Sequence, residues 1–262
     1  MRFRHIAAAV AAVVAAVPGC SSSTDAQPAG LQESVFPGYV VVGKFPHDPA
    51  AYTQGFDFRR EALFEGTGLN GRSSLRRVDL ETGEVLRQVD LAERFFGEGI
   101  VVLGRRIYQL TWQSERAFVY DRRTFRRIRR FTYEGEGWGL THDGRRLIMS
   151  DGTSTIEFRD PDTFEVTGQI EVTEEGQPVS SLNELEWVNG EIFANVYPTD
   201  DVVRIDPDTG EVTGHLDLSP LKQQEPDGEV TNGIAYMESQ DRLFVTGKLW
   251  SSVYEIELTD LP

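Results

Sequence analysis

Residues 96–112 read FGEGIVVLGRRIYQLTW and contain the pattern that decides the fold. Glu98 stands between two glycines and precedes an apolar run over residues 100–103. A polar turn then leads into a second apolar segment that ends at Trp112. Short apolar segments separated by polar turns are typical of β-strands. The flanking glycines let the backbone turn sharply beside the acid.

This unit recurs five times along the chain. Apolar pairs after a short polar turn start 44, 40, 45 and 51 residues apart, and they are Leu63-Phe64, Ile107-Tyr108, Leu147-Ile148, Ile192-Phe193 and Leu243-Phe244. Independent turn sequences start 42, 39 and 46 residues apart, at Asp79, Asp121, Asp160 and Asp206. No segment past residue 35 has helical periodicity over a useful length. The sequence therefore predicts an all-β protein, a five-bladed β-propeller over residues 36–262.

The terminal strands predict how the ring closes. An apolar strand over residues 39–43 precedes the first full repeat, and the last repeat ends after residues 253–258. We predict that the N-terminal strand pairs into the last blade as its outer strand. This pairing would close the ring without a covalent link and remove open sheet edges.

The first 35 residues have a different composition. Arg2 and Arg4 precede an apolar run over residues 6–17, which has the length of a signal-peptide core and is too short for a permanent membrane helix. Small residues before Cys20 resemble the lipobox of bacterial lipoproteins. We predict a signal peptide over residues 1–19, lipidation at Cys20 and a flexible tether over residues 20–35. The alternative for Cys20 is a buried free thiol.

These features predict export and anchoring to the outer face of the cell membrane, or otherwise secretion. Contact with the membrane is expected only through the lipid, and we expect a monomer. The single cysteine permits no intramolecular disulfide. The net charge of −16 argues against nucleic acid as a partner.

No cofactor or metal ion is expected. The four histidines are scattered, and the chain has neither an HExxH motif nor a cysteine cluster, so catalytic zinc is improbable. The Asp-Pro-Asp sequences at residues 160–162 and 206–208 are better explained as hairpin turns than as calcium loops.

Counting from the apolar pairs places two rings of residues at one mouth of the propeller channel. The first ring lies nine residues before the first residue of each apolar pair, or eleven before it in the last repeat, and consists of Gln54, Glu98, Trp138, Asn183 and Asn232. The second ring lies five residues after the first residue of each apolar pair and consists of Gly68, Trp112, Gly152, Tyr197 and Lys248. Adjacent antiparallel strands meet at the same end, so the rings should form one pocket with an acid, a cation, amides and aromatic side chains.

Each of these residues has a simpler explanation. Trp112 and Trp138 could pack between blades, and the ring amides could satisfy turn backbone. Glu98 could form a structural ion pair with Lys248. Three further acids are rivals of Glu98, namely Glu65, Glu136 and Glu184.

Several motifs resemble the plant-type glutaminyl-peptide cyclotransferases, the papaya-latex kind, which also occur in bacteria. They are Tyr52-Thr53-Gln54-Gly55, Phe96-Gly97-Glu98-Gly99, Tyr108-Gln109-Leu110-Thr111-Trp112, Glu136-Gly137-Trp138-Gly139, Leu182-Asn183-Glu184-Leu185-Glu186, Asn232-Gly233-Ile234 and Thr246-Gly247-Lys248-Leu249-Trp250. The resemblance extends from residue 39 to 258 and implies a five-bladed propeller. It also implies an aminoacyltransferase that converts N-terminal glutamine of peptides or proteins into pyroglutamate and releases ammonia.

The resemblance further implies roles for single residues. Glu98 would be the general base and acid, and Lys248 and Asn183 would complete the catalytic group. The substrate would contact Tyr52, Gln54, Phe96, Trp112, Trp138, Tyr197 and Asn232. Tyr197 stands where plant members have a further pocket tryptophan.

Two other functions remain open from the sequence. One is a non-catalytic propeller that binds peptides or glycans with the same aromatic pocket. The other is a metal-dependent propeller lactonase, which would need a cluster of metal ligands around the channel. The convergence of an acid, a cation and amides on one mouth favours the enzyme over the binding protein.

Overall fold

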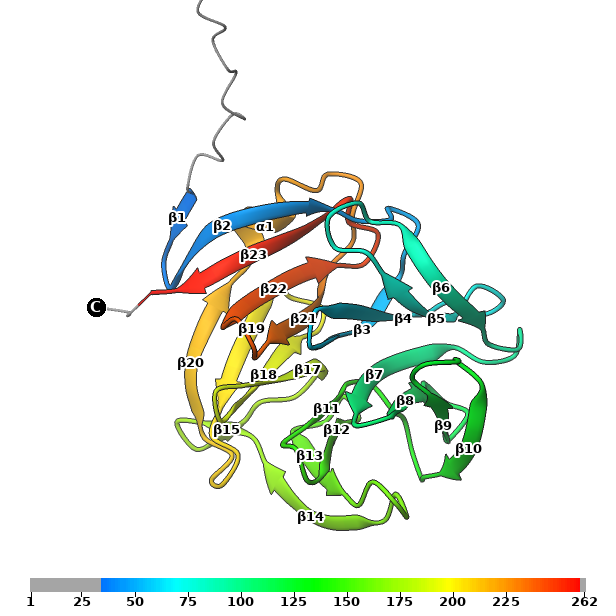
Figure 1. The fold of residues 1–262 in the computed structure, drawn as a ribbon. Helices are drawn as coiled ribbons and strands as arrows, with labels where there is room; N and C mark the ends of the chain where they lie inside the picture. Colours follow the sequence, from blue (N-terminus) through cyan, green and yellow to red (C-terminus); the bar gives the residue numbers. More distant parts are fainter. Residues whose placement is uncertain (1–33, 260–262) are drawn as a thin grey trace, which may run out of the picture. The chain divides into compact units, whose positions relative to one another are not determined.

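Five antiparallel sheets of four or five strands are arranged in a ring in the computed structural model, which describes residues 34–259 (Figure 1). Each sheet is one predicted blade, so the five-bladed propeller is confirmed. In the first four blades the first strand along the chain lies innermost, and the next strands follow outward as successive hairpins. The fifth blade follows the same order through its first three strands and adds the two N-terminal strands on its outer side. This order explains the period in the low forties, because each repeat is one complete sheet.

The first two blades are regular four-stranded meanders. Blade 1 contains β3 (Thr53–Arg59), β4 (Ala62–Thr67), β5 (Ser74–Val78) and β6 (Val85–Asp90). Blade 2 contains β7 (Gly97–Leu103), β8 (Arg106–Thr111), β9 (Arg116–Asp121) and β10 (Arg127–Thr132).

The next two blades have the same order. Blade 3 contains β11 (Leu140–His142), β12 (Leu147–Ser150), β13 (Thr155–Arg159) and β14 (Val166–Glu171). Blade 4 contains β17 (Leu182–Val188), β18 (Glu191–Val196), β19 (Asp201–Ile205) and β20 (Val212–Asp217). A small hairpin of β15 (Thr173–Glu174) and β16 (Gln177–Pro178) joins them.

Blade 5 contains both ends of the described chain. Its strands are β21 (Thr231–Met237), β22 (Arg242–Gly247), β23 (Ser252–Leu258), β2 (Tyr39–Pro46) and β1 (Ser34–Phe36). The short helix α1 (Ser219–Lys222) precedes it and accounts for part of the longest spacing between apolar pairs.

The N-terminal strand closes the ring as predicted. β2 pairs antiparallel with β23, from Tyr39 opposite Leu258 to Pro46 opposite Ser252, and the two strands lie side by side in Figure 1. One detail differs, because β2 is not the outermost strand. β1 turns back along β2 through a two-residue turn at Pro37-Gly38, and the positive φ of Gly38 after a proline is the pattern of a type II turn.

β1 also begins inside the segment 20–35 assigned to a tether, so the propeller starts at or before residue 34. The predicted signal peptide, Cys20 and the remainder of the tether lie outside the described residues, and lipidation and export stay predictions. Among residues 34–259 no helix has the length and apolar character needed to cross a bilayer.

The hydrophobic core is divided among the contacts between blades. Five clusters of buried residues each join two neighbouring sheets. Phe64 and Leu75 of blade 1, for example, pack against Ile100 and Phe118 of blade 2. The alternation of apolar residues along the strands therefore buries both faces of each sheet, and this fixes the position of each inner strand around the channel.

Buried carboxyl groups connect inner strands that do not belong to one sheet. Glu184 accepts hydrogen bonds from the backbone N–H groups of Phe56 (3.2 Å) and Ile234 (2.8 Å). Glu186 accepts one from Tyr236 (2.8 Å), and Asp57 accepts one from Val102. Inner strands splay apart around the channel, so these N–H groups have no ladder partner and take side-chain acceptors instead.

Burial raises the pKa of these three carboxyls. The pKa of Asp57 rises to about 7, and those of Glu184 and Glu186 rise well above their ordinary value, although the backbone hydrogen bonds oppose the shift. A carboxyl whose pKa is higher in the folded than in the unfolded chain stabilises the fold below its ordinary pKa. That stabilisation is lost as the pH rises through the folded pKa.

We therefore expect the free energy of unfolding to fall between about pH 5 and about pH 8, as measured by urea denaturation. Asp57→Asn keeps an oxygen that can accept from Val102 but cannot ionise, so its stability should fall less over the same range. An equal fall in both proteins would show that Asp57 does not titrate in this range.

Candidate active site

Bulges in the inner strands position the first ring of predicted residues. The ladder between β7 and β8 pairs Gly97 with Thr111 and then Ile100 with Gln109, so Glu98 lies in a β-bulge. The same irregularity occurs at Gln54, Asn183 and Asn232. A bulge re-aims a side chain out of the regular alternation, and here it directs ring residues toward the channel mouth.

Glycines after the ring residues allow neighbouring inner strands to approach closely. A Cβ atom on Gly99 would lie 2.6 Å from the carbonyl oxygen of Trp138, and one on Gly139 would lie 1.9 Å from that of Asn183. The Gly99 N–H instead donates to the Trp138 carbonyl at 2.8 Å. The repeated polar-Gly sequence is thus a packing requirement of the ring as well as a feature of the site.

The two rings meet in a cavity of about 210 Å³ at one mouth of the channel. Nine of the ten residues implied by the resemblance line it, and they are Tyr52, Gln54, Phe96, Glu98, Trp112, Trp138, Asn183, Tyr197 and Lys248. The cavity is smaller than the roughly 300–1,000 Å³ of sites for drug-sized ligands. It therefore fits one amino-acid side chain better than a folded peptide segment.

Glu98 is the only carboxylate among these lining residues. Its side chain is buried, and Oε1 accepts a hydrogen bond from Gln54 Nε2 at 2.8 Å. Burial raises the pKa of Glu98 well above its ordinary value, while Lys248 and the Gln54 hydrogen bond oppose that shift. A carboxyl with a raised pKa can both accept and return a proton near neutral pH.

Lys248 is a buried cation between two tyrosine rings. Its Nζ lies 5.0 Å from the ring centroid of Tyr52 and 5.1 Å from that of Tyr197, and its exposed fraction is 3%. Burial lowers the pKa of Lys248, and the negative charges of Glu98 and Glu229 oppose the shift. The aromatic faces partly replace the water that the ammonium group lacks.

Aromatic side chains form most of the cavity wall. Phe96 contacts Tyr52 edge-on at 6.2 Å between ring centroids and Trp112 at 5.7 Å. Trp138 meets Tyr197 edge-on at 5.9 Å. A rim of this kind excludes water from the groups beneath it and can hold the aliphatic part of a substrate.

Glu136 connects the two tryptophans of this wall. Its Oε2 accepts from the indole nitrogens of Trp112 (2.6 Å) and Trp138 (2.9 Å), and Oε1 accepts from Gln113 at 2.8 Å. Burial alone would raise the pKa of Glu136, but these three donors hold it below its ordinary value. Glu136 therefore orients the indole rings and does not line the cavity.

The two predicted asparagines have different positions. Asn183 lines the cavity, and its buried Oδ1 has no hydrogen-bond partner among the described residues, so it is available to a ligand. Asn232 does not line the cavity, in contrast to its predicted contact with substrate. It is fully buried behind Gln54 and donates to Gln54 Oε1 (3.2 Å) and to the Thr53 carbonyl (2.9 Å). Asn232 thus turns the Gln54 amide toward Glu98.

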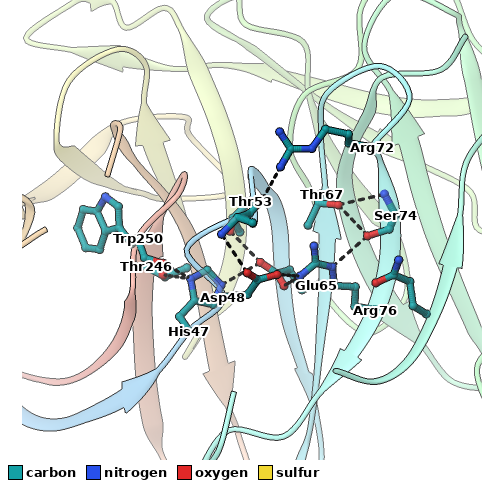
Figure 2. Close-up of polar contacts among 12 residues, drawn as sticks. His47, Asp48, Thr53, Glu65, Thr67, Arg72, Ser74, Arg76, Thr246 and Trp250 are labelled. Atoms are coloured by element: carbon teal, nitrogen blue, oxygen red, sulfur yellow. Dashed lines mark hydrogen bonds and ion pairs between the residues drawn. The ribbon is translucent and has the colours of Figure 1, made fainter. Parts of the chain in front are cut away.

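The other rival acids also have positions of their own. Glu184 lies farther along the channel and bonds backbone N–H groups, as described above. Glu65 is buried and contacts His47, Thr53 and Arg76 (Figure 2). No local sequence pattern marks His47 or Arg76, because their partners are distant in the chain.

In the two Asp-Pro-Asp hairpin turns, the first Asp side chain accepts hydrogen bonds from the backbone of the same turn. Asp160 Oδ1 accepts the backbone N–H groups of Asp162 and Thr163, and Asp206 Oδ1 does the same for Asp208 and Thr209. These residues are turns, as predicted. Across residues 34–259 no group of three or more His, Cys, Asp or Glu side chains is arranged to hold a metal ion.

Three comparisons with known proteins identify the family of the chain. The family model of the glutamine cyclotransferases matches residues 10–258. The chain is 44% identical over 227 residues to a glutaminyl-peptide cyclotransferase of Arabidopsis thaliana, a match that covers 83% of this chain and 70% of the relative. The crystal structure of Myxococcus xanthus glutaminyl cyclase superposes with a TM-score of 0.79 at 36% identity, covering 86% of this chain and 100% of that one.

These relatives are enzymes, which favours catalysis over the non-catalytic binding protein. The family model covers nearly the whole chain, and the Arabidopsis enzyme is 44% identical to it, so both the family and the activity can be assigned. The chain belongs to the glutamine cyclotransferase family and is a glutaminyl-peptide cyclotransferase, an enzyme that cyclises N-terminal glutamine to pyroglutamate.

Proposed function

We propose that the cavity binds the N-terminal glutaminyl residue of a peptide and that Glu98 transfers the proton during its cyclisation, without a metal ion. The observation that carries this proposal is the position of Glu98. It is the one carboxylate lining a small cavity with aromatic walls, and its pKa is raised. Such a group is suited to act as base and then as acid.

Binding would fold the glutaminyl side chain back on its own α-amine. Phe96, Trp112 and Trp138 would contact its methylene groups and confine them. Asn183, whose Oδ1 has no partner in the described structure, would accept a hydrogen bond from the substrate amide or amine. Holding the amine nitrogen near the amide carbon makes the reaction intramolecular and lowers its entropic barrier.

The reaction then forms one bond and breaks one. The neutral α-amine nitrogen attacks Cδ of the γ-carboxamide, and Glu98 accepts a proton from that nitrogen. The tetrahedral intermediate collapses as its C–NH₂ bond breaks, and Glu98 returns the proton so that ammonia leaves. Lys248 or the Asn183 amide nitrogen would stabilise the negative oxygen of that intermediate.

Ammonia release from a Gln-Ala dipeptide tests this proposal. We expect release that a chelating agent does not reduce, with conversion of the dipeptide to its pyroglutamyl form. An Asn-Ala dipeptide is the control, because a side chain one methylene shorter would have to close a smaller, strained ring. Loss of activity on chelation would contradict the metal-independent mechanism and leave the family assignment intact.

A further inference from the structure

Glu65 is a fully buried carboxylate on β4 that lies among His47, Thr53 and Arg76 (Figure 2). Its Oε1 accepts hydrogen bonds from His47 Nε2 (3.0 Å) and Thr53 Oγ1 (2.8 Å). Its Oε2 has no hydrogen-bond partner among the described residues and lies 3.7 Å from Arg76 Nη1. We call His47, Thr53 and Glu65 the Glu65 junction. None of the three lines the cavity.

One side of the junction leads to Glu98. Thr53 is followed by Gln54, whose Nε2 donates to Glu98. Asn232 bonds both the Thr53 carbonyl and the Gln54 side chain, so these two residues are held as one unit. The position of Thr53 therefore sets the position of the amide that orients the Glu98 carboxyl.

The other side leads to Lys248. His47 Nδ1 bonds the carbonyl oxygen of Trp250 at 2.8 Å, and the His47 backbone N–H donates to Ser251 at 2.9 Å. Lys248 occupies the same turn, next to Leu249, which has a φ of 60°. A branched residue in the left-handed region is strained and persists only where its surroundings hold it. The hydrogen bonds from His47 to Trp250 and Ser251 help to keep Leu249 in this conformation.

The geometry favours a charged imidazole at this place. Both ring nitrogens of His47 face oxygen atoms, one of a carboxyl group and one of a backbone carbonyl, and a doubly protonated ring can donate to both. Burial alone would lower the pKa of His47, but Glu65 and the carbonyl raise it overall. Burial would raise the pKa of Glu65, while His47 and Arg76 lower it overall. Asp48 is the other charged neighbour, and it accepts from Arg76 at 2.7 Å.

We infer that His47 and Glu65 are positioning residues of this enzyme, which fix the separation between the Glu98 carboxyl and the Lys248 ammonium group. A single carboxylate oxygen connects blade 1, which orients the acid, with the blade 5 turn that presents the cation. The inference rests on the proposed function, since it gives Glu98 and Lys248 their roles. It concerns how those two groups are held and does not add a third group that touches substrate.

Glu65→Gln is the sharpest variant. The amide removes the charge that keeps the second proton on His47. A neutral imidazole cannot donate to both the Trp250 carbonyl and residue 65, and an amide turned so that its nitrogen donates to His47 Nε2 loses the hydrogen bond that Oε1 accepts from Thr53. We expect kcat to fall about ten-fold or more, since small displacements of catalytic groups have effects of this size. In a Lys248→Met background the same change should lower kcat only about two-fold. That protein has no ammonium group at position 248, so its distance from the Glu98 carboxyl can no longer affect the rate.

The three lysines of the chain, Lys44, Lys222 and Lys248, offer a readout independent of turnover. Brief acetylation followed by mass spectrometry should show Lys248 protected in the wild type relative to the more exposed Lys44. Glu65→Gln should increase the acetylation of Lys248 several-fold and leave the other two unchanged. This measurement decides the question if the Lys248→Met background is too slow to assay.

Tyr236→Phe is the matched control. It removes hydrogen bonds to Asn189 and Asp241 at the other end of blade 5, so it should lower stability without changing kcat. An equal loss of kcat in both backgrounds, with unchanged acetylation of Lys248, would overturn the inference. Wild-type kcat in Lys248→Met alone would instead overturn the proposed role of Lys248.

Discussion

Glu98→Gln is expected to lower kcat about 10²- to 10⁴-fold, because general acid–base transfer contributes an acceleration of this size. The amide has nearly the same shape as the carboxyl and can still contact Gln54, but it cannot accept a proton from the attacking amine. Aromatic contacts with the substrate should persist, so KM should change much less than kcat. Initial rates of ammonia release from a Gln-initiated peptide measure both constants.

Thermal unfolding is the control for this variant. The amide has the shape of the carboxyl and keeps an oxygen that can accept the hydrogen bond from Gln54, so the fold should be retained. Wild-type turnover in Glu98→Gln would remove Glu98 from the mechanism. Glu136→Gln is a useful companion, because it alters an acid that touches the indoles but does not line the cavity. It should retain far more activity than Glu98→Gln.

Lys248→Met is the second variant with a large expected effect, a loss of about 10²-fold in kcat. Removal of one donor from a developing oxyanion typically costs 10²–10³-fold, and the reason is that the donor is already in place when the charge appears. Methionine keeps much of the side-chain length between Tyr52 and Tyr197. The loss should therefore appear in kcat, and the fold should be retained.

The same variant has a consequence for the pH profile. Lys248 lowers the pKa of Glu98, so its removal should raise that pKa further. Glu98 must be ionised to accept the proton, so the acidic limb of kcat/KM should move to higher pH in Lys248→Met. An unchanged acidic limb, together with wild-type kcat, would mean that the ammonium group is not coupled to the acid.

Much of the fold could be predicted because its period is local. Pairs such as Ile107-Tyr108 mark the start of the second strand in each sheet, and the spacing between pairs is one blade. Counting from these pairs reached Glu98 and Lys248, which are far apart in sequence but line one cavity. The prediction succeeds because equivalent positions in a propeller necessarily converge on its axis.

The supporting contacts could not be predicted in this way. Asn232 has the same register as Glu98 and the same bulge, yet it lies behind Gln54 and outside the cavity. Glu136 and Glu65 resemble catalytic acids in sequence, and only their partners show that one orients indoles and the other joins two blades. The position of a residue in the repeat predicts that it lies near the channel mouth. It does not predict whether its side chain lines the cavity or is buried behind another residue.

The sequence by itself determined the number of blades, the closing strand and the residue types at the channel mouth. Each of these follows from alternation, turn chemistry and a fixed repeat, which are properties of neighbouring residues. Only the tertiary structure decided which carboxyl lines the cavity, which carboxyls have their pKa raised by burial, and which join strands across the channel. The reason is that desolvation and hydrogen bonding depend on groups from other blades, such as His47 beside Glu65 or Lys248 beside Tyr197.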